Sequence, residues 1–473
     1  MHTQPQYFKP QAKAALADPV IRNNFRGAMD FLRHKRASVF PDQPAFDQLQ
    51  ATAEAIRKRA LQQLPDLLER LEKNCLANGI QVHWAETADQ ANRIINGIID
   101  RHQGKQVIKG KSMATEEIGL NDYLEQQGKR CLESDMGEYI VQLAGEHPSH
   151  IIMPAIHKNA EEIGQLFAEK IADTDFTTDV DSLIQIGRQQ LREGFRHADI
   201  GITGVNFAVA ETGTLCLVEN EGNGRMTSTI PPVHIALAGI EKVIPSLADI
   251  PPLLSLLTRS ATGQIITTYF NMITRPRQTA DGERDGPEEL HLVLLDNGRT
   301  QAYADSQFRD TLLCIRCGAC MNHCPVYTRI GGHAYGTTYP GPIGKIISPH
   351  LLGLEDTKDL PVASSLCGAC EEVCPVNIPI PQLLQRLRRQ AALPNDVPAS
   401  LVGAGSSRYR LEAGFWKLWS WLCRHPRSYQ LATWSLARGR SMVKLVKSPW
   451  NLNRSTPKPA ARTLHELLKQ QQR

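Results

Sequence analysis

Apolar residues recur at helical spacing in the first part of the chain. Between Phe46 and Leu76 they alternate with charged residues at intervals of three and four, at Ile56, Leu61, Leu64, Leu67, Leu68 and Leu71. This period predicts an amphipathic helix, and Gly79 supplies a residue type that commonly ends one. We therefore predict a helical N-terminal region over residues 1–75.

From residue 76 onward, short apolar runs alternate with helical patterns. The predicted strands are QVHWA (81–85), QVIKG (106–110), RCLES (130–134) and HIIMPA (150–155). The predicted helices start after Thr87 and run to Gln103, cover 115–127, and then span roughly 159–171 and 179–198. Strands that alternate with helices in this way form a parallel α/β sheet.

The pattern changes beyond residue 198. Apolar runs broken by glycines continue to about residue 245 and predict closely spaced strands with tight turns. ELHLVLLDNGR (289–299) predicts a closing strand and turn, and SQFRDTLLCIRC (306–317) predicts a helix. Pro394 and Pro398 then mark a boundary before the C-terminal tail, 394–473.

Two cysteine groups follow the predicted helix. The first has the C-x2-C-x2-C-x3-C-P spacing of a bacterial ferredoxin, with cysteines at 314, 317, 320 and 324. In this spacing three thiolates surround one iron–sulfur cluster and the fourth is presented to a different cluster. When the second group is aligned on Cys374-Pro375, Cys370 and Cys367 fill matching positions, and Ser364 stands where a first cysteine would be.

Crossed ligation divides the seven cysteines between two 4Fe–4S clusters. Cluster one takes Cys314, Cys317, Cys320 and Cys374, and cluster two takes Cys324, Cys367 and Cys370. The open corner of cluster two is compatible with a 3Fe–4S form, or with iron held by a ligand other than cysteine: Ser364, water or an atom of a partner. A hydroxyl is a harder ligand than a thiolate, so this corner is predicted to be labile or open to substrate.

Two other uses of the cysteines fit the pattern less well. Zinc sites usually take two cysteine pairs and have no need of a third cysteine or a trailing proline. A cluster with a purely structural role remains an alternative, but two adjacent clusters favour a redox relay, since one would suffice to hold the fold.

The composition is that of an ordinary water-soluble chain of two to four domains. Of 473 residues, 41% are apolar and 22% charged, and we find no apolar run of membrane-spanning length and no secretory signal. Seven cluster ligands among eleven cysteines indicate a reducing cytoplasm rather than a disulfide framework. The other four, Cys75, Cys131, Cys216 and Cys423, are predicted to be free thiols.

Charge is concentrated at the C-terminus. Residues 401–473 hold 14 Lys/Arg and 2 Asp/Glu, a balance of +12, so the net charge of +4 leaves −8 (4 − 12) for the rest. The segment 415–434, FWKLWSWLCRHPRSYQLATW, combines aromatic and basic residues. This pattern predicts docking to a partner first and peripheral membrane contact second. Nucleic acid is not expected, because no recognition module accompanies the tail.

A few other residues are weak candidates for catalysis or anion binding. Lys109 and Lys111 lie at a strand end before a predicted helix, a common anion site, although a solvated loop explains them as well. Arg225 lies near a strand end. Glu211, in AETGT, is either a carboxylate with a shifted pKa or part of a turn. Taken alone, this short motif favours the turn. The sequence has neither a Walker A loop nor a dinucleotide fingerprint.

The interval 331–347, GGHAYGTTYPGPIGKII, joins the two cysteine groups. Its glycines would let backbone N–H groups approach sulfur, because glycine removes the steric barrier of a side chain. The alternative interpretation is a simple connecting loop.

The chain as a whole resembles the lactate utilisation protein B (LutB) family. The resemblance rests on KGKSMATEEIGLN, PSHIIMPAIHK, GITGVNFAVAETGT, ELHLVLLDNGR and the seven-cysteine pattern with its missing eighth cysteine. It implies an α/β LUD domain, similar to the CoA-transferase and ribose-phosphate isomerase class, over residues 76–299. It also implies an α-helical ferredoxin-like domain with two 4Fe–4S clusters over residues 300–393.

The resemblance further implies oxidation of L-lactate to pyruvate by a complex with LutA-like and LutC-like subunits, in which this chain passes electrons. Lys109, Lys111 and Arg225 are then candidates to anchor the lactate carboxylate. Two alternatives stay open: a self-contained LUD-domain enzyme acting on a hydroxyacid or acyl substrate around Glu211, and a structural or regulatory iron–sulfur protein.

Overall fold

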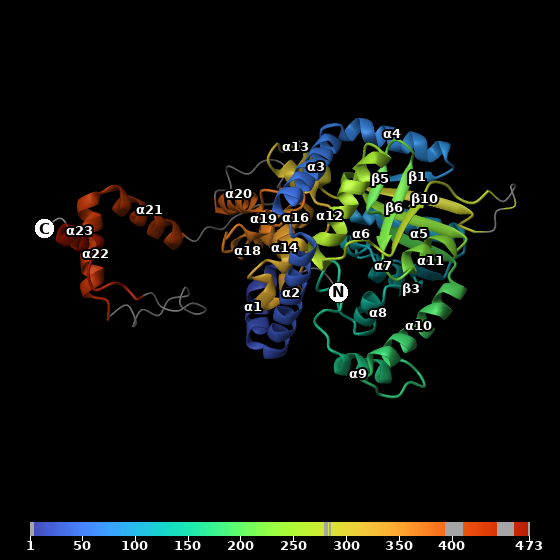
Figure 1. Ribbon diagram of the computed structural model, residues 1–473, viewed down its shortest axis with the longest axis horizontal. Coiled ribbons are helices and arrows are strands. Elements are labelled where there is room, and N and C mark those ends of the chain that lie inside the picture. The colour runs from blue at the N-terminus through green and yellow to red at the C-terminus, as the bar shows by residue number, and fades with distance from the viewer. Residues whose placement is uncertain (1–3, 279–281, 283–284, 393–409, 442–457, 472–473) are drawn as a thin grey trace. The chain divides into compact units, whose positions relative to one another are not determined.

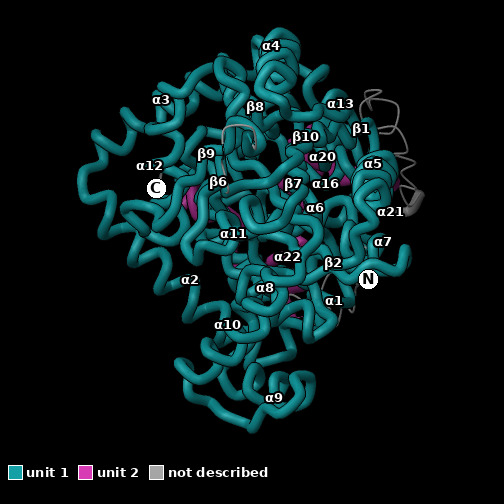
Figure 2. Tube along the Cα trace, turned by 90° about the vertical axis from the view of Figure 1, so that its right-hand side faces the viewer, with its two compact units in different colours: residues 1–405 teal, residues 406–473 magenta. Residues whose placement is uncertain are grey.

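The computed structural model describes residues 4–278, 282, 285–392, 410–441 and 458–471 (Figure 1). The chain divides into two compact units, residues 1–405 and residues 406–473 (Figure 2). The finer division of the larger unit at residues 75 and 299 stays a prediction. Pro394 and Pro398 lie outside the described residues.

The N-terminal region consists of helices, as predicted. They are α1 (Phe8–Ala17), α2 (Pro19–Val39), α3 (Gln43–Gln62) and α4 (Leu64–Ala77). The side chain of Asp18 accepts hydrogen bonds from the first N–H groups of α2, and Asp42 caps α3 in the same way. Such caps satisfy backbone donors that have no partner inside the helix.

A six-stranded parallel sheet forms the centre of the α/β region. Its order is β1-β10-β7-β4-β2-β3, with every neighbouring pair parallel. The strands are β1 (Gln81–Ala85), β2 (Gln106–Lys109), β3 (Arg130–Glu133), β4 (Ile200–Gly204), β7 (Val233–Gly239) and β10 (Glu289–Leu295). The predicted parallel sheet is therefore confirmed, as are the strands at 81–85, 106–110 and 130–134. The predicted strand and turn over 289–299 are confirmed too, with the strand ending at Leu295 and the turn at 297–298.

Helices cover both faces of this sheet. They are α5 (Ala88–Arg101), α6 (Met113–Glu117), α7 (Leu120–Gln126), α8 (Met136–Leu143), α9 (Ala160–Lys170) and α10 (Val180–His197). Apolar residues of α5 and α7 pack on one face, and those of α8, α9 and α10 pack on the other face at the β2–β3 edge. The Thr87 hydroxyl caps α5 by accepting from the N–H of Gln90, as predicted.

The predicted strand at 150–155 is wrong, because these residues form turns. The ring Nδ1 of His150 accepts from the N–H groups of Ile152 and Met153, at 3.0 and 3.2 Å, and this bends the chain. The apolar run that suggested a strand is directed instead toward the cysteines, since Ile151 lines the pocket that they form.

A second, smaller sheet is formed by strands that alternate in sequence with the later strands of the first sheet, and it confirms the predicted closely spaced strands. Its order is β8-β5-β6-β9, made of β5 (Phe207–Val209), β6 (Thr214–Glu219), β8 (Val243–Ile244) and β9 (Tyr269–Ile273). Helix α11 (Asn223–Thr229) leaves β6 and packs closely on β4, and α12 (Ile250–Thr262) follows β8. A side chain at Gly201 would place its Cβ 1.9 Å from the Thr227 carbonyl oxygen, so this contact requires glycine.

From Arg299 to Ala392 the described elements are helices. They are α13 (Arg299–Ala304), the 3₁₀ helices η5 (Phe308–Leu313) and η6 (His333–Tyr335), α14 (Ala319–Asn322), α15 (Tyr327–Ile330), α16 (Gly341–Leu352), α17 (Leu354–Thr357), α18 (Asp359–Val362), α19 (Ala369–Glu372) and α20 (Ile380–Ala392). The predicted helix at 306–317 is shorter, because the chain leaves its helical conformation at Cys314. The second half of the interval 331–347 is helical rather than a loop.

One hydrophobic core joins the cysteine-bearing segments to the sheet. Along β10, Leu292 and Leu294 face this core while Val293 and Leu295 face α5, as expected for alternating side chains of a strand. The same core contains residues of α2, α3 and α4 and the buried Cys317, Cys324 and Cys374. These three cysteines are therefore held by the interior of the larger unit and not by an appended module.

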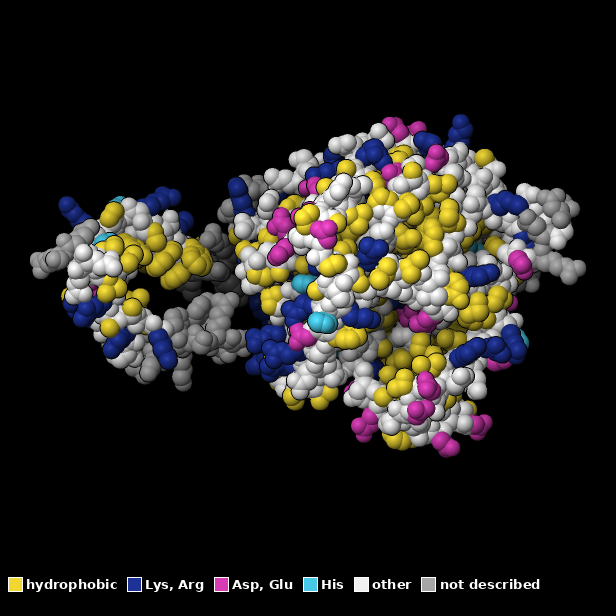
Figure 3. Space-filling model, viewed as in Figure 1, with side chains coloured by type: hydrophobic (Ala, Val, Ile, Leu, Met, Phe, Trp, Pro, Cys, Tyr) yellow, Lys and Arg dark blue, Asp and Glu magenta, His cyan; other side chains and the backbone are white. Residues whose placement is uncertain are grey.

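The second unit contains α21 (Arg410–Arg424), α22 (Pro426–Arg438) and α23 (Leu464–Gln471). Figure 3 shows hydrophobic side chains gathered along α21, and Phe415, Trp416, Leu418, Trp419 and Trp421 are all exposed. Among the described residues, no helix has both the length and the apolar character to cross a membrane.

Arg57 of α3 connects three parts of the larger unit. Its side chain is 2% exposed and donates to backbone carbonyl oxygens of Glu241, Val243, Leu312 and Leu313, over distances of 2.6 to 3.2 Å. Residues 312 and 313 directly precede the first cysteine. Since each buried carbonyl needs a donor, this one side chain fixes the approach to Cys314.

We predict that Arg57→Met destabilises the chain by about 3 kcal/mol or more, because it leaves several buried carbonyl groups without a donor. Thermal unfolding of the anaerobically purified protein, followed by circular dichroism, measures the effect. The control is Lys58→Met on the same helix, where an exposed pair with Glu54 contributes about 1 kcal/mol or less. Equal unfolding midpoints for the two variants would contradict the assigned role of Arg57.

Candidate functional site

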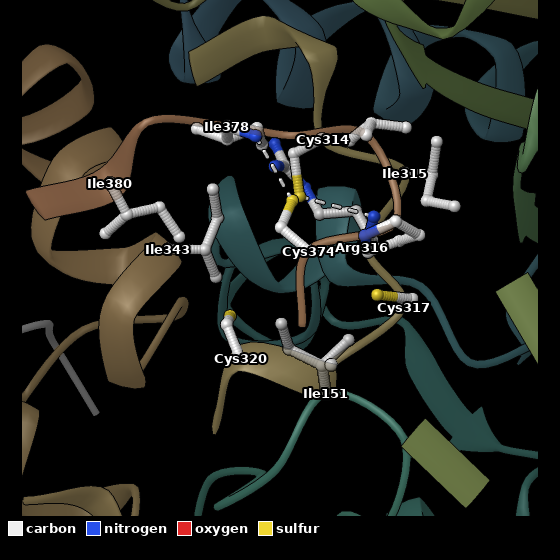
Figure 4. Close-up of a pocket in the computed structure, with 13 residues that line it drawn as sticks. Ile151, Cys314, Ile315, Arg316, Cys317, Cys320, Ile343, Cys374, Ile378 and Ile380 are labelled. Atoms are coloured by element: carbon white, nitrogen blue, oxygen red, sulfur yellow. Dashed lines mark hydrogen bonds between the residues drawn. The ribbon is translucent and has the colours of Figure 1, made fainter. Parts of the chain in front are cut away.

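Four of the predicted ligands line one pocket in the larger unit. Figure 4 shows the sulfurs of Cys314, Cys317, Cys320 and Cys374 around a common space, with apolar side chains such as Ile151 and Ile343 closing it. The first three come from the loop after η5 and from α14, whereas the fourth comes from the second cysteine group. The structure thus brings together the set that the sequence assigns to cluster one.

Backbone N–H groups point at these sulfurs. The N–H of Arg316 donates to Cys314 Sγ at 3.3 Å, and that of Ile378 donates to Cys374 Sγ at 3.4 Å. The N–H of Ile343, at the start of α16, donates to the sulfur of Cys320. One N–H of the interval 331–347 therefore reaches a cysteine sulfur, while the approach of its glycine backbone to cluster sulfide stays a prediction.

Burial in this pocket disfavours the ionised form of an isolated thiol. Burial raises the pKa of Cys374 to about 12 and raises the pKa values of Cys317 and Cys320 well above that of a free thiol. Such thiols ionise when they bind a metal, because the metal supplies the missing positive charge. Four soft donors in an apolar pocket, with N–H groups directed at them, fit an iron–sulfur cluster.

The other three predicted ligands meet around Lys345 of α16. Its Nζ lies 3.7 Å from Cys324 Sγ and donates to the Ala363 carbonyl oxygen at 2.5 Å. Burial lowers the pKa of Lys345, and the neighbouring thiols of Cys324 and Cys370 oppose that shift. A fully buried ammonium beside thiols is favourable only if those thiols carry negative charge, as they do when bound to iron.

The second group lies closer to solvent than the first. Cys324 is buried and Cys370 is half-buried, but Cys367 is exposed. The pKa of Cys367 is lowered, chiefly by a hydrogen bond from the N–H of Ala369 and then by one from the Ser365 hydroxyl. Among the described residues, which include all eleven cysteines, every cysteine is a free thiol, as predicted for the four cysteines outside the motifs.

A buried ion-pair network connects the first cysteine group to the α/β region. The Glu241 carboxylate accepts from Arg299 at 2.5 Å and from Arg316 at 3.3 Å. Arg299 also forms a two-point ion pair with Glu117, at 2.8 Å to each oxygen, and the Tyr339 hydroxyl donates to the same carboxylate at 2.7 Å. These five side chains come from five separate segments of the chain and are held together by charge-assisted hydrogen bonds.

The network keeps its carboxylates ionised. Burial alone would raise the pKa of Glu241, but Arg299 and Arg316 more than offset burial and hold that pKa at about 2. Burial also opposes ionisation of Glu117, and Arg299 reverses that shift, so the pKa of Glu117 lies below its ordinary value. Arg316 itself stacks over the Tyr339 ring at 4.7 Å, which places a permanent positive charge beside Cys314.

Lys109, a candidate anion anchor, is already paired. Its ammonium is fully buried and lies 2.7 Å from Glu133 and 3.0 Å from Glu116. Burial raises the pKa of Glu133 to about 7 despite Lys109, and burial also raises the pKa of the neighbouring Glu138. Lys109 thus neutralises a group of buried carboxylates and is not open to solvent.

The other weak candidates occupy separate elements. Lys111 lies in the loop between β2 and α6 and donates to the carbonyl oxygen of Ile152. Arg225 lies in the first turn of α11, where its N–H donates to Glu219 at 2.7 Å. Glu211 is exposed in the turn between β5 and β6 and accepts from the N–H of Leu247 at 3.1 Å, as the turn interpretation expects.

Sequence reasoning missed the side chains that support the cysteines. Arg57, Glu117, Glu241, Arg299 and Lys345 lie far from the motifs in sequence, or between them without a motif of their own. The available signal was weak: each is a charged residue within or beside an apolar run, a pattern that also fits a solvated helix face.

Three family models match successive parts of the chain. A model described as LUD domain matches residues 68–295, and one described as 4Fe-4S dicluster domain matches residues 310–378. A model described as Lactate utilisation protein B, C-terminal, matches residues 386–473. The larger unit therefore carries a LUD domain with a parallel-sheet α/β core and a 4Fe–4S dicluster domain.

Curated proteins are similar over most of the chain. The uncharacterized electron transport protein YkgF of Escherichia coli is 40% identical over 98% of this chain and 97% of its own length. Lactate utilization protein B of Bacillus subtilis is 44% identical over 85% of each chain, and that of Macrococcus caseolyticus is 45% identical over 81% of this chain and 80% of its own. A crystal structure of a DUF162 family protein from Deinococcus radiodurans covers 49% of this chain and 98% of that chain at 14% identity, but its TM-score of 0.28 supports no argument.

We predict that Arg299→Gln costs about 3–5 kcal/mol at neutral pH, because it leaves the Glu117 and Glu241 carboxylates buried without their main counter-ion. The wild-type pKa of Glu241 is depressed, so its contribution is present above the unfolded value near 4.3 and is lost as pH falls through about 2.

In the variant both carboxylates are expected to bind protons more readily in the folded state, so the deficit shrinks as pH falls from about 8 to about 5. Denaturant unfolding at several pH values checks this, with Arg196→Gln at an exposed pair with Glu193 as the control. A deficit that does not change with pH would contradict the role of the network.

Proposed function

This chain belongs to the lactate utilisation protein B family, and from this premise we propose that it is the iron–sulfur electron-transfer subunit of a complex that oxidises L-lactate to pyruvate. The observation that carries the proposal is the meeting of cysteines from both motifs at one pocket, beside a second cysteine group. A structural metal site would need neither the crossing nor the second group. The relatives named for lactate utilisation and for electron transport support the same function.

We propose that the cysteines hold two 4Fe–4S clusters. Cluster one is held by Cys314, Cys317, Cys320 and Cys374, and cluster two by Cys324, Cys367 and Cys370. Each bound cluster supplies a centre that accepts and releases one electron. Because lactate oxidation to pyruvate releases two electrons, a pair of one-electron centres suits the reaction.

The protein positions the two centres differently with respect to solvent. The pocket of cluster one is closed by apolar side chains, and two of its cysteines, Cys317 and Cys374, are buried. The group at Cys367 reaches the surface. We propose that electrons are exchanged with a partner at the exposed group, and that the buried group is sheltered from water.

Buried cations would stabilise the added electron at each cluster. Arg316 lies beside Cys314, and the Lys345 ammonium lies 3.7 Å from Cys324 Sγ. A positive charge near a cluster favours its reduced, more negative form and raises its potential. The backbone N–H groups directed at the sulfurs act in the same sense.

We propose LutA-like and LutC-like subunits as partners. The second unit offers the surface for docking, because α21 exposes Trp416, Trp419 and Trp421 beside basic residues. The same surface suits peripheral contact with a membrane as a second use. The cytoplasm is the proposed location, since it keeps the cluster cysteines reduced.

The anchor for the lactate carboxylate stays a prediction. Of the three candidates, Lys109 is committed to Glu133 and Glu116, which leaves Lys111 and Arg225 nearer to solvent. A self-contained enzyme around Glu211 is not favoured, because that carboxylate lies in an exposed turn and accepts from a backbone N–H.

For the α/β domain we propose a fold similar to that of the CoA-transferase and ribose-phosphate isomerase class. For the cysteine region we propose a ferredoxin-like fold.

We expect the anaerobically purified chain to contain iron and acid-labile sulfide, with an EPR signal after reduction by dithionite. With LutA-like and LutC-like subunits present, L-lactate should produce the same signal, and D-lactate serves as the control. A chain that holds zinc, or iron–sulfur clusters that L-lactate leaves oxidised in the complete complex, would refute the proposed function.

Crossed ligation predicts that Cys374→Ala and Cys324→Ala damage different clusters. Cys374→Ala should remove the EPR signal of cluster one, although Cys374 lies in the second motif, and Cys324→Ala should affect cluster two. Cys423→Ala, in the second unit, is the control and should leave iron content unchanged. Ligation within each motif would reverse the two outcomes, and iron quantitation with EPR distinguishes them.

A further inference from the structure

The two cysteine motifs adopt the same local backbone conformation, offset by fifty residues in the sequence. Gly318 and Gly368 have φ values of +85° and +84°, and each precedes a short helix, α14 and α19. Two residues before each glycine, a residue other than glycine also has positive φ: Arg316 at +62° and Leu366 at +55°. Because such residues seldom adopt positive φ, the agreement marks a repeated structural unit.

The repeat places Ser364 in the position of Cys314. In the first motif the N–H of Arg316 donates to Cys314 Sγ at 3.3 Å, and in the second the N–H of Leu366 donates to Ser364 Oγ at 3.2 Å. The side-chain atom therefore receives the same backbone hydrogen bond in both motifs. In the first motif that atom is a predicted cluster ligand.

The segments that lead into these two positions are also held alike. The carbonyl of Leu313, just before Cys314, accepts from the buried Arg57, and the carbonyl of Ala363, just before Ser364, accepts from the buried Lys345. Arg388 of α20 holds the second segment further by donating to the carbonyl oxygen of Ser364 at 2.8 Å. Ser364 is thus fixed by surrounding side chains rather than being part of an unrestrained loop.

Lys345 connects this segment to the second cysteine group. Its Nζ contacts both the Ala363 carbonyl oxygen and Cys324 Sγ, so the residue before Ser364 lies beside the sulfur that crosses over from the first motif. Ser364 therefore lies on the side of the second cysteine group where the cluster has no cysteine ligand.

We infer that the Ser364 hydroxyl oxygen is the fourth protein ligand of the second cluster, and that this cluster is a four-iron centre with one oxygen ligand. This inference rests on the proposed function, since it requires two clusters. Binding exchanges the O–H bond of Ser364 for an Fe–O bond, with no change in oxidation state. The released proton passes to water, which reaches the half-buried side chain.

The test compares Ser364→Ala and Ser364→Cys with the wild-type chain, all purified anaerobically. After mild oxidation, Ser364→Ala should lose one iron atom per chain and show the EPR signal of a three-iron cluster, because its fourth iron has lost its protein ligand. Ser364→Cys should keep that iron under stronger oxidation, since a thiolate is a softer ligand. Its Mössbauer spectrum should lose the component of the oxygen-bound iron.

The control is Ser306→Ala, which removes an exposed hydroxyl of the same unit outside both cysteine motifs. It should keep the wild-type iron content after the same oxidation. If Ser364→Ala instead keeps its fourth iron as the wild type does, or if Ser364→Cys leaves the Mössbauer spectrum unchanged, the ligand is not Ser364. A wild-type chain without iron and sulfide would refute the proposed function itself, so the two failures are distinguishable.

Discussion

Buried positive charge beside cysteine sulfur is the interaction on which the larger unit depends. Arg57, Arg316 and Lys345 each lie almost fully inside the protein and each joins a cysteine-bearing segment to another part of the chain. Isolated cations would be costly in such an interior. They are stable there because carboxylates, carbonyl oxygens and sulfurs surround them, and bound clusters would add the negative charge that completes the balance.

This charge balance explains why the α/β region and the cysteine region share one core. Glu117 and Glu241 belong to the sheet region, yet they fix Arg299 and, through Glu241, Arg316 beside Cys314. A change in the α/β region therefore reaches the electrostatic environment of the first cysteine group through a chain of direct contacts. The arrangement links the LUD domain to the charges that surround the first cysteine group.

Local patterns were enough to predict the sheet and the cysteine groups, because strand periodicity and motif spacing are properties of neighbouring residues. The strand prediction at 150–155 failed because Ile151 is buried against the cysteine pocket rather than against a neighbouring strand. Lys109 resembled an anion site because nothing in the sequence reveals that Glu133 is its direct neighbour in the parallel register. The contacts of Arg299 depend in the same way on how distant segments pack.

The exposure of Cys367 has a chemical consequence for the intact protein. Molecular oxygen and superoxide diffuse through water and attack iron–sulfur centres where they are accessible. Since Cys317 and Cys374 are buried and Cys367 is at the surface, damage by air would begin at the second cysteine group and spare the first. A partner that covered this surface would then protect the second cysteine group from oxygen as well as exchange electrons with it.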